Sequence, residues 1–381
     1  MESLRVLAIE PYYGGSHKAF LDGWRQGSRH RWELITLPPS KWKWRMRHSA
    51  ITCAAVAKNL IDSGQHFDVL FASDMLNLAE FRGLAPTPIS NLPALVYFHE
   101  NQLTYPVRNE KERDLHFAMT NLTTFLAAQE VWFNSSFHHR SFVNALDAFL
   151  RRMPDFQPLE AVERIRQGCK IMPQGIRPPA PRGERSPGPL RILWAARWEH
   201  DKNPELFFDA IHRLENQTSL DFRLSVVGEQ FRDVPEIFAQ ARESLGHRID
   251  RWGYQESRQE YEAVLSEADV FVSTADHEFF GIAAAEAMAA GCYPLLPKRL
   301  AYPELLAPLA RDQRRRHLYD GTAQDLANRL MELTQSLRQG EWLGSREIVH
   351  AMDRFTWPKL RPKLDTALTA VAKNQPHRMP M

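Results

Sequence analysis

The chain has 381 residues, about twice the length of a typical domain, and its 44% apolar and 25% charged residues suit a globular protein with two cores. A formal net charge of +2 excludes a strongly basic nucleic-acid-binding protein, so any such function must rest on local patches. The chain shows no signal-peptide pattern and no run of roughly 20 apolar residues, so we expect no membrane contact. Cys53, Cys169 and Cys292 are far apart, which predicts free thiols and a cytoplasmic protein.

Short β-rich apolar runs alternate with helical patterns along the whole chain. They begin, in order, at Leu4, Trp32, Phe67, Ala94, Glu130, Cys169, Leu190, Phe222, Arg248, Asp269 and Cys292. This alternation predicts βαβ units and parallel sheets, and therefore two facing Rossmann-like doubly wound α/β domains with ligands at the carboxyl ends of the strands. We expect domains at residues 1–176 and 190–354, a Pro/Gly-rich linker at 177–189, and a proline-broken helical tail at 355–381 that can pack back on the first domain.

Two glycines follow the first strand, in the stretch EPYYGGSHKAF. Gly14 and Gly15 precede a helical pattern that Ser16 can cap. The spacing is not G-x-G-x-x-G, so a dinucleotide cofactor is not expected. The alternative is a tight turn without a ligand.

Cations and aromatic residues alternate in the stretch LPPSKWKWRMRHSA, which begins at Leu37. An extended segment would separate two faces, the cationic one formed by Lys41, Lys43, Arg45 and Arg47 and the other by Trp42, Trp44 and Met46. Cations contact phosphate oxygens and tryptophans stack on unpaired bases, so one interpretation of the pattern is RNA binding. The alternative is an edge strand with its tryptophans in the core. A second basic cluster, residues 311–316, is expected to be a solvated loop.

Polar residues also stand at the end of the fourth predicted strand, in YFHENQLTYPV. His99, Glu100 and Asn101 lie there, and the pattern is not H-E-x-x-H, so a zinc protease is poorly supported. The alternative for His99 is a core histidine with its hydrogen bonds satisfied.

The first strand of the second half is followed by AARWEHDKNP. This stretch places Arg197 and Lys202 at the strand's carboxyl end, with Asp201 or Asn203 as the cap of a helix that has Pro204 in its first turn. Two cations there could neutralise a diphosphate leaving group. The alternative is a solvated charged loop.

A third stretch of this kind, DHEFFGIAAAEAMAAG, follows the strand that begins at Asp269. Residues 276–280 are predicted to be a loop and a helix to begin near Gly281, whose backbone N–H groups would form a phosphate site. Glu278 in the loop and Glu286 inside the helix suit a nucleotide sugar, one carboxylate for the sugar and one for the ribose. The alternative is a surface loop followed by an alanine-rich core helix.

These second-half motifs together resemble the retaining glycosyltransferases of family 4, which have the GT-B fold. The resemblance implies that Arg197 and Lys202 bind the donor phosphates, that Glu278 binds the donor sugar and that Glu286 binds the ribose. It further implies donor contacts from Gly14, Gly15, Phe280, Gly281 and Ile282, and catalytic roles for His99, Glu278, Arg197 and Lys202, with His99 beside the donor sugar. The chain has no D-x-D, the usual metal handle of such enzymes, so neither a metal nor another cofactor is expected.

The motifs of the first half match one family more specifically than those of the second half do. EPYYGGSHK, LPPSKWKWRMRHSA, FASDMLNL, YFHENQLTYPV, ERDLHFAMTN and VWFNSSFH closely resemble the tRNA-queuosine α-mannosyltransferase family. The resemblance implies a cytosolic enzyme that transfers mannose from GDP-mannose, with retention, to the cyclopentene diol of queuosine in the anticodon loop of tRNA-Asp. The tRNA-binding residues would be Lys41, Trp42, Lys43, Trp44, Arg45, Arg47, Glu100 and Asn101.

Two other functions remain open from the sequence. A family 4 relative could transfer a hexose to a small polyol, a lipid or an envelope glycan, in which case tRNA would not bind. A tRNA-binding module with a degenerate donor site is the second, and the presence of both glutamates, Arg197 and Lys202 argues against it.

Overall fold

The computed structural model describes residues 3–107, 113–179, 185–217, 221–340 and 346–373. The chain forms two compact units, Met1–Gly175 with Trp357–Met381, and Ile176–Thr356. The segment predicted as a linker, 177–189, falls in the second unit by this division, and its residues 180–184 lie outside the described residues.

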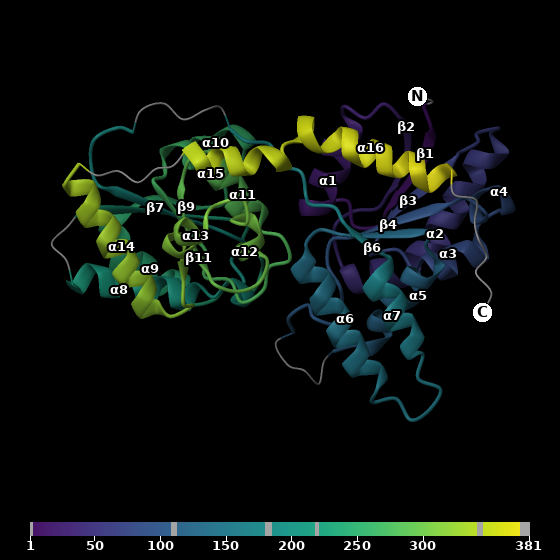
Figure 1. Cartoon of the computed structure of the whole chain (residues 1–381), viewed down its shortest axis with the longest axis horizontal. Helices are drawn as coiled ribbons and strands as arrows, with labels where there is room; N and C mark the ends of the chain where they lie inside the picture. The colour runs from purple at the N-terminus through teal and green to yellow at the C-terminus, as the bar shows by residue number, and fades with distance from the viewer. Residues whose placement is uncertain (1–2, 108–112, 180–184, 218–220, 341–345, 374–381) are drawn as a thin grey trace. The chain divides into compact units, whose positions relative to one another are not determined.

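The first unit is built on a six-stranded sheet in the order β2-β1-β3-β4-β5-β6, in which all pairs are parallel (Figure 1). Strands β3 and β4 are buried at every residue, as expected of central parallel strands covered on both faces. The strands are β1 (Arg5–Glu10), β2 (Arg31–Thr36), β3 (Val69–Ser73), β4 (Ala94–Phe98), β5 (Glu130–Phe133) and β6 (Cys169–Ile171).

Alternate residues of β1 face two different cores. Leu7 and Ile9 join the core under α2, α3, α5, α6 and α7, whereas Val6 and Ala8 join the core under α1 and α16. The helices are α1 (Gly15–Arg25), α2 (Trp42–Asp62), α3 (Leu78–Leu84), α4 (Thr87–Ser90), α5 (Leu115–Ala127), α6 (Ser136–Leu150), α7 (Leu159–Gly168) and α16 (Trp357–Lys373).

Helix α16 at the end of the chain belongs to the first unit. Its buried Asp365 accepts hydrogen bonds from the Trp24 indole N–H at 2.8 Å and from the Arg29 backbone N–H at 2.9 Å. The Trp357 ring fills the space where a Cβ at Gly23 would lie. The tail was predicted to be broken by proline, but α16 continues through Pro362, so the contacts that hold α16 outweigh one missing backbone hydrogen bond.

The second unit repeats the plan with a parallel sheet in the order β12-β11-β10-β7-β8-β9. Its strands are β7 (Leu190–Ala195), β8 (Phe222–Val227), β9 (Ile249–Gly253), β10 (Val270–Val272), β11 (Tyr293–Pro297) and β12 (Leu318–Tyr319). Its helices are α8 (Pro204–Gln217), α9 (Ile237–Leu245), α10 (Arg258–Glu267), α11 (Ile282–Ala289), α12 (Tyr302–Leu305), α13 (Arg311–His317), α14 (Ala323–Arg338) and α15 (Arg346–Met352), with short 3-10 turns η2 (His200–Lys202), η3 (Gly246–Arg248) and η4 (Asp353–Phe355).

Two local predictions were wrong. Helix α1 begins at Gly15 with Gly14 as its N-cap and without a side-chain cap, so Ser16 does not cap it. The basic cluster at 311–316 is helix α13 rather than a loop, because arginine and glutamine are good helix formers and Gln313 accepts a hydrogen bond from the Ala310 backbone N–H at 3.1 Å.

Candidate functional site

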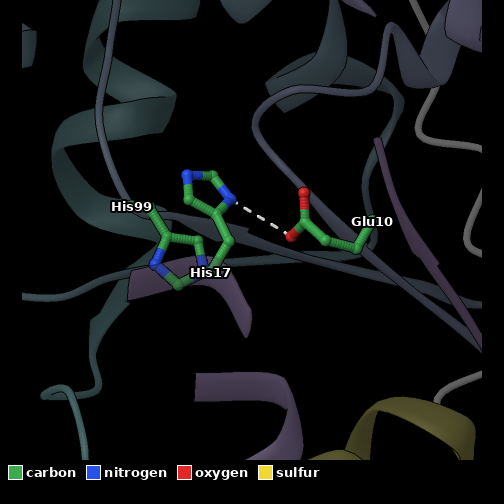
Figure 2. A group of neighbouring side chains, drawn as sticks. All are labelled: Glu10, His17 and His99. Atoms are coloured by element: carbon green, nitrogen blue, oxygen red, sulfur yellow. Dashed lines mark hydrogen bonds and ion pairs between the residues drawn. The ribbon is translucent and has the colours of Figure 1, made fainter. Parts of the chain in front are cut away.

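A group of buried ionisable side chains lies at the carboxyl ends of β1 and β4 in the first unit. Glu10 ends β1, His99 follows β4, and His17 comes from the first turns of α1 (Figure 2). The Glu10 Oε2 atom lies 3.1 Å from His17 Nδ1, and the His17 and His99 rings stack with their centroids 4.0 Å apart. The sequence pointed to His99 but not to Glu10 or His17, because the contact of His99 with this pair joins the ends of two strands that are far apart in the sequence.

The charges in this group are set by burial and by close partners. Burial lowers the pKa of His17, but the charge of Glu10 and its hydrogen bond outweigh this and raise that pKa to about 9. Burial, helped by the nearby His17, holds the pKa of His99 well below its ordinary value. His17 is therefore an imidazolium at neutral pH and His99 is neutral.

The same three residues are the group that could hold a metal ion, as far as the described residues show. One ligand atom from each of Glu10, His17 and His99 lies within 4.8 Å of the others. A metal would have to replace the proton that His17 shares with Glu10, since only deprotonated imidazole binds metals.

The glycine pair and the residues after His99 mainly shape their loops. A Cβ at Gly14 would lie 2.4 Å from Pro39, and Gly15 has a φ of +50° with open space where a Cβ would be. Asn101 is fully buried, and its Oδ1 accepts hydrogen bonds from the backbone N–H groups of the two residues that follow Gln102. Glu100 accepts a hydrogen bond at 2.9 Å from Gln102, so the loop is internally braced.

The basic segment at 41–47 is not extended. From Trp42 it forms the first turns of α2, so the predicted two-faced strand and the alternative edge strand are both wrong. The physical reason is that Met46, Ala50, Cys53 and Ala57 recur at helical spacing and are buried, the last three in the core that covers the sheet and Met46 beside Met75 and Phe117.

The helix sorts the segment's side chains differently from a strand. Trp42 is partly buried with its ring 5.1 Å from that of Phe117, whereas Trp44 is 59% exposed and stacks on His48. The Arg45 Nε–H donates a hydrogen bond to the Pro38 carbonyl at 3.0 Å. The exposed cations of the segment are Lys41, Lys43 and Arg47.

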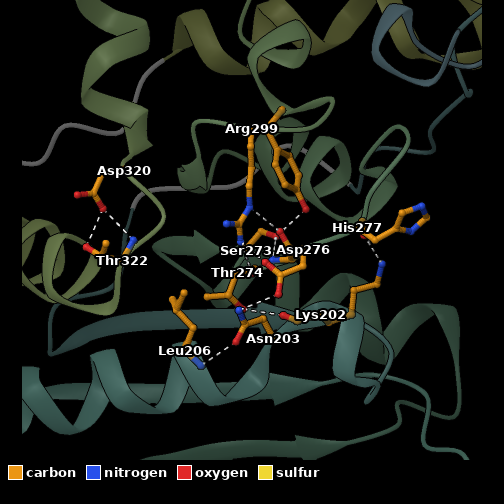
Figure 3. Close-up of polar contacts among 12 residues, drawn as sticks. Lys202, Asn203, Leu206, Ser273, Thr274, Asp276, His277, Arg299, Asp320 and Thr322 are labelled. Atoms are coloured by element: carbon orange, nitrogen blue, oxygen red, sulfur yellow. Dashed lines mark hydrogen bonds and ion pairs between the residues drawn. The ribbon is translucent and has the colours of Figure 1, made fainter. Parts of the chain in front are cut away.

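In the second unit, Lys202 and Glu278 meet at the carboxyl end of the sheet. Lys202 is 8% exposed, and its Nζ donates to the His277 carbonyl at 2.8 Å (Figure 3). The same Nζ lies 3.7 Å from Glu278 Oε2. Burial lowers the pKa of His277 to about 4, so this ring is neutral. The predicted cation and carboxylate are therefore neighbours in space.

The loop that carries Glu278 is held by residues that sequence analysis did not single out for this purpose. Asn203 donates to Asp276 at 2.9 Å and its Oδ1 accepts from the Leu206 backbone N–H, which makes it the helix cap that was one of two predicted choices (Figure 3). Arg299 donates to Asp276 at 2.6 Å and to the Thr274 carbonyl at 3.1 Å. The loop is thus fixed from two sides.

Helix α11 begins where it was predicted to begin. Gly281 is its N-cap with a φ of +93°, a conformation that favours glycine, and the Tyr302 ring lies 3.2 Å from where a Cβ would be. The first N–H groups of a helix have no partner within the helix, so they suit an anion. A narrow cavity at this point has Lys202, Glu278 and Gly281 in its wall.

A second, larger cavity of about 400 Å³ adjoins the first, since Ala195, Ala196 and Ala283 line both. Arg197 lines this larger cavity, together with Tyr254 and other residues of the loops after β8 and β9. The volume falls in the range of small-molecule sites, roughly 300–1,000 Å³. Phe280 is different: its side chain is buried and packs on Phe355 with centroids 5.3 Å apart, whereas Ile282 is partly exposed.

Glu286 forms an ion pair with Arg258, a residue that the sequence did not point to. Both of its oxygens accept from Arg258, at 2.9 and 3.1 Å. Burial raises the pKa of Glu286 although Arg258 opposes the rise. Arg258 also lines the larger cavity, which connects Glu286 to that site.

Comparisons with known proteins agree with both halves of this description. The family model "tRNA-queuosine alpha-mannosyltransferase N-terminal" matches residues 5–176, and the model "Glycosyl transferases group 1" matches residues 180–339. The chain is 40% identical over 312 residues to a tRNA-queuosine alpha-mannosyltransferase of Drosophila melanogaster, which covers 79% of this chain and 81% of that protein. A GDP-mannose:cellobiosyl-diphosphopolyprenol alpha-mannosyltransferase of Xanthomonas campestris is 32% identical over 127 residues, 31% of this chain and 30% of that one.

Solved structures support the fold. Anabaena HepE in complex with UDP and glucose matches with a TM-score of 0.67 and 15% identity, over 96% of this chain and 100% of that chain. Sucrose-phosphate synthase from Thermosynechococcus elongatus matches with a TM-score of 0.67 and 18% identity, over 96% and 99%. The chain therefore belongs to the tRNA-queuosine alpha-mannosyltransferase family, and it is a hexosyltransferase with the two-domain GT-B fold.

Proposed function

We propose that the protein transfers mannose from GDP-mannose, with retention, to the cyclopentene diol of queuosine in the anticodon loop of tRNA-Asp. The observation that carries this proposal is the match of residues 5–176 to the N-terminal family model, because that half holds the family-specific stretches. The relative from Drosophila melanogaster, named a tRNA-queuosine alpha-mannosyltransferase, supports mannosyl transfer to queuosine in tRNA over most of the chain.

The donor is assigned to the second unit. The β-phosphate is placed at the first N–H groups of α11 beside Lys202, and Arg197 neutralises the charge that develops on the diphosphate as the bond to the sugar breaks. Glu278 accepts hydrogen bonds from sugar hydroxyls, and the nucleoside takes the cavity of about 400 Å³. Glu286 binds the ribose, and Arg258 holds its carboxylate ready.

The donor diphosphate needs no metal in this proposal, because Lys202, Arg197 and helix N–H groups supply the positive charge. His99, in the first unit, is assigned to the donor sugar as a neutral ring. The enzyme is placed in the cytoplasm. Within the described residues, every helix is too short or too polar to cross a bilayer.

The tRNA is assigned to the start of α2. Lys41, Lys43 and Arg47 are exposed there and can contact phosphates, and Trp44 offers an exposed ring for an unpaired base. An anticodon loop supplies such bases, because loop bases can be splayed out of the stack. A small acceptor would leave this surface without a purpose.

A second candidate is transfer of mannose to a lipid-linked glycan. The observation that favours it is the partial match to the polyprenol mannosyltransferase of Xanthomonas campestris. The match covers only 31% of the chain, so it supports this candidate less than the match over 79% of the chain supports the first.

The deciding experiment is incubation of the purified protein with bulk tRNA and a panel of nucleotide sugars, followed by mass analysis of the nucleosides. We expect one hexose on queuosine, from GDP-mannose alone. Queuosine-free tRNA is the substrate control, and Lys202→Ala is the enzyme control. Transfer to a polyprenol-linked glycan with no change in queuosine would replace the proposal by the second candidate.

A further inference from the structure

The buried group of Glu10, His17 and His99 has an arrangement that the proposed reaction does not by itself explain (Figure 2). The three side chains are between 1% and 6% exposed, and they come from β1, α1 and the loop after β4. Any role of this group in catalysis rests on the proposed function, in which His99 faces the donor sugar.

The Glu10 carboxylate is fixed in orientation. Its Oε1 accepts hydrogen bonds from the Tyr12 backbone N–H and from the Ser73 hydroxyl, both at 2.9 Å. Its Oε2 is left for His17 Nδ1 at 3.1 Å. The carboxylate therefore cannot turn without losing these bonds, and it sets the position of the His17 ring.

The His99 ring depends on packing for its orientation. Its backbone is anchored, since the N–H donates to Asp74 Oδ1 at 2.8 Å and the carbonyl accepts from Asn134 at 3.0 Å. Its ring has no hydrogen bond within the described part of the chain, and its Nε2 is buried without a partner there. Three rings touch it instead: His17 flat at 4.0 Å, Phe20 edge-on at 5.4 Å and Tyr97 at 4.6 Å.

Of these three rings, His17 differs because it is tied to a carboxylate that is itself held by two further hydrogen bonds. We infer that Glu10 and His17 are positioning residues for His99: the Glu10 carboxylate clamps the His17 ring flat against the His99 imidazole and so fixes the angle at which His99 meets the donor sugar. A histidine that acts on a reacting sugar must be held within a narrow range of orientations, and a small misplacement costs about 10² in rate.

A metal ion is the rival explanation, since the same atoms lie within 4.8 Å of one another. Two observations favour positioning. The His17 Nδ1 atom already has a partner in Glu10, and the two rings lie nearly parallel, at 29°, instead of both directing a nitrogen at one central point.

The test compares His17→Ala, which removes the stacked ring, with His17→Phe, which keeps a flat ring but loses the hydrogen bond to Glu10. His30→Ala is the matched control, because His30 is another buried histidine of the same unit, bonded to Leu4 and Asp365. We expect His17→Ala to lower kcat by about 10–100-fold with little change in KM for tRNA, His17→Phe to recover only part of the loss because Glu10 no longer holds its ring, and His30→Ala to lower Tm without this kcat effect.

A second readout does not depend on turnover. In NMR spectra of protein with ¹⁵N-labelled histidine, the His99 ring signals should shift and broaden in His17→Ala and, to a smaller extent, in His17→Phe. Unchanged His99 signals in His17→Ala, or unchanged kcat, would overturn the inference, and so would about one equivalent of bound transition metal that Glu10→Ala removes. Absence of mannosyl transfer by wild-type protein would instead count against the proposed function, and the spectra would still decide the role of His17.

Discussion

Replacing Arg258 by methionine should destabilise the second unit, because it leaves the buried Glu286 carboxylate without its cation. Methionine keeps an apolar stem of similar length and removes the two charged hydrogen bonds to Glu286, at 2.9 and 3.1 Å, together with those to Glu262 and the Arg177 carbonyl. Breaking a fully buried pair costs about 3–5 kcal/mol, and an exposed pair contributes about 0–1 kcal/mol. Glu286 is 7% exposed, but the Arg258 side chain is 40% exposed, so we expect a loss of about 2–3 kcal/mol.

The loss should depend on pH in a definite direction. Burial already raises the pKa of Glu286, and removal of Arg258 raises it further. A carboxyl group whose pKa is higher in the folded state favours folding only when it is protonated. The loss of unfolding free energy in Arg258→Met should therefore reach its full size at neutral pH, where Glu286 is ionised. It should shrink as the pH falls through the folded pKa of Glu286 toward the unfolded value of about 4.3.

Hydrogen exchange read by mass spectrometry is the assay, because peptides from β7, β10 and α11 report the free energy of opening of the second unit alone. Arg223→Met is the matched control: Arg223 pairs with Asp250 in the same unit, and both side chains are more than a third exposed. We expect the control to cost no more than about 1 kcal/mol. An Arg258→Met loss equal to the control, or one that stays constant with pH, would refute the reasoning.

The remaining predictions concern the proposed sites. Glu278→Ala should lower kcat by about 10²–10³ with little change in Tm, since it removes a preorganised polar contact from a loop. A rise in KM for the donor with kcat unchanged would contradict this. Lys43→Ala should weaken tRNA binding and flatten the slope of log K against log salt by roughly 0.7–0.9 for the one phosphate that is no longer neutralised, with GDP affinity unchanged as the control. Trp44→Ala should cost about 1–3 kcal/mol of tRNA affinity, whereas Trp42→Ala should mainly lower Tm because that ring packs on Phe117; the reverse pattern would exclude base stacking by Trp44. Donor hydrolysis should persist in excess chelator, and activity restored only by magnesium or manganese would contradict the metal-free donor site. The pKa of His17 is raised to about 9, so its contribution to stability is complete below pH 6.5 and is lost as the pH rises through 9; urea titrations should show a loss of up to about 3 kcal/mol in this window that is absent from His17→Phe.

The sequence alone predicted the strands except for the two-residue β12, and it predicted where the main motifs stand on them. The apolar runs that begin at Leu4, Phe67 and Asp269 became β1, β3 and β10, and Gly281 marked the start of α11. Backbone hydrogen bonding within a strand or helix follows short-range patterns of apolar residues, glycine and proline, and these can be read along the chain. The family was recognisable for the same reason, since its motifs are contiguous stretches.

The start of α2 shows where a short pattern misleads. Seven residues, 41–47, alternate as an extended segment would, but burial at Met46, Ala50, Cys53 and Ala57 makes the whole stretch to Asp62 one helix. The alternation with a period of two extends over only seven residues, whereas the apolar pattern with a period of 3.6 extends over the 21 residues of α2. The helix forms because the longer pattern buries more apolar surface.

Only the tertiary structure decided which side chains meet. Glu10 and His99 lie far apart in the sequence and come together through His17 because β1, β3 and β4 are neighbours in the sheet. Arg258 in α10 pairs with Glu286 in α11, and no local sequence pattern predicts this pair. Strand order is set by long-range packing, so the partners of each charged group, and with them its pKa, follow from the fold and not from the order of residues along the chain.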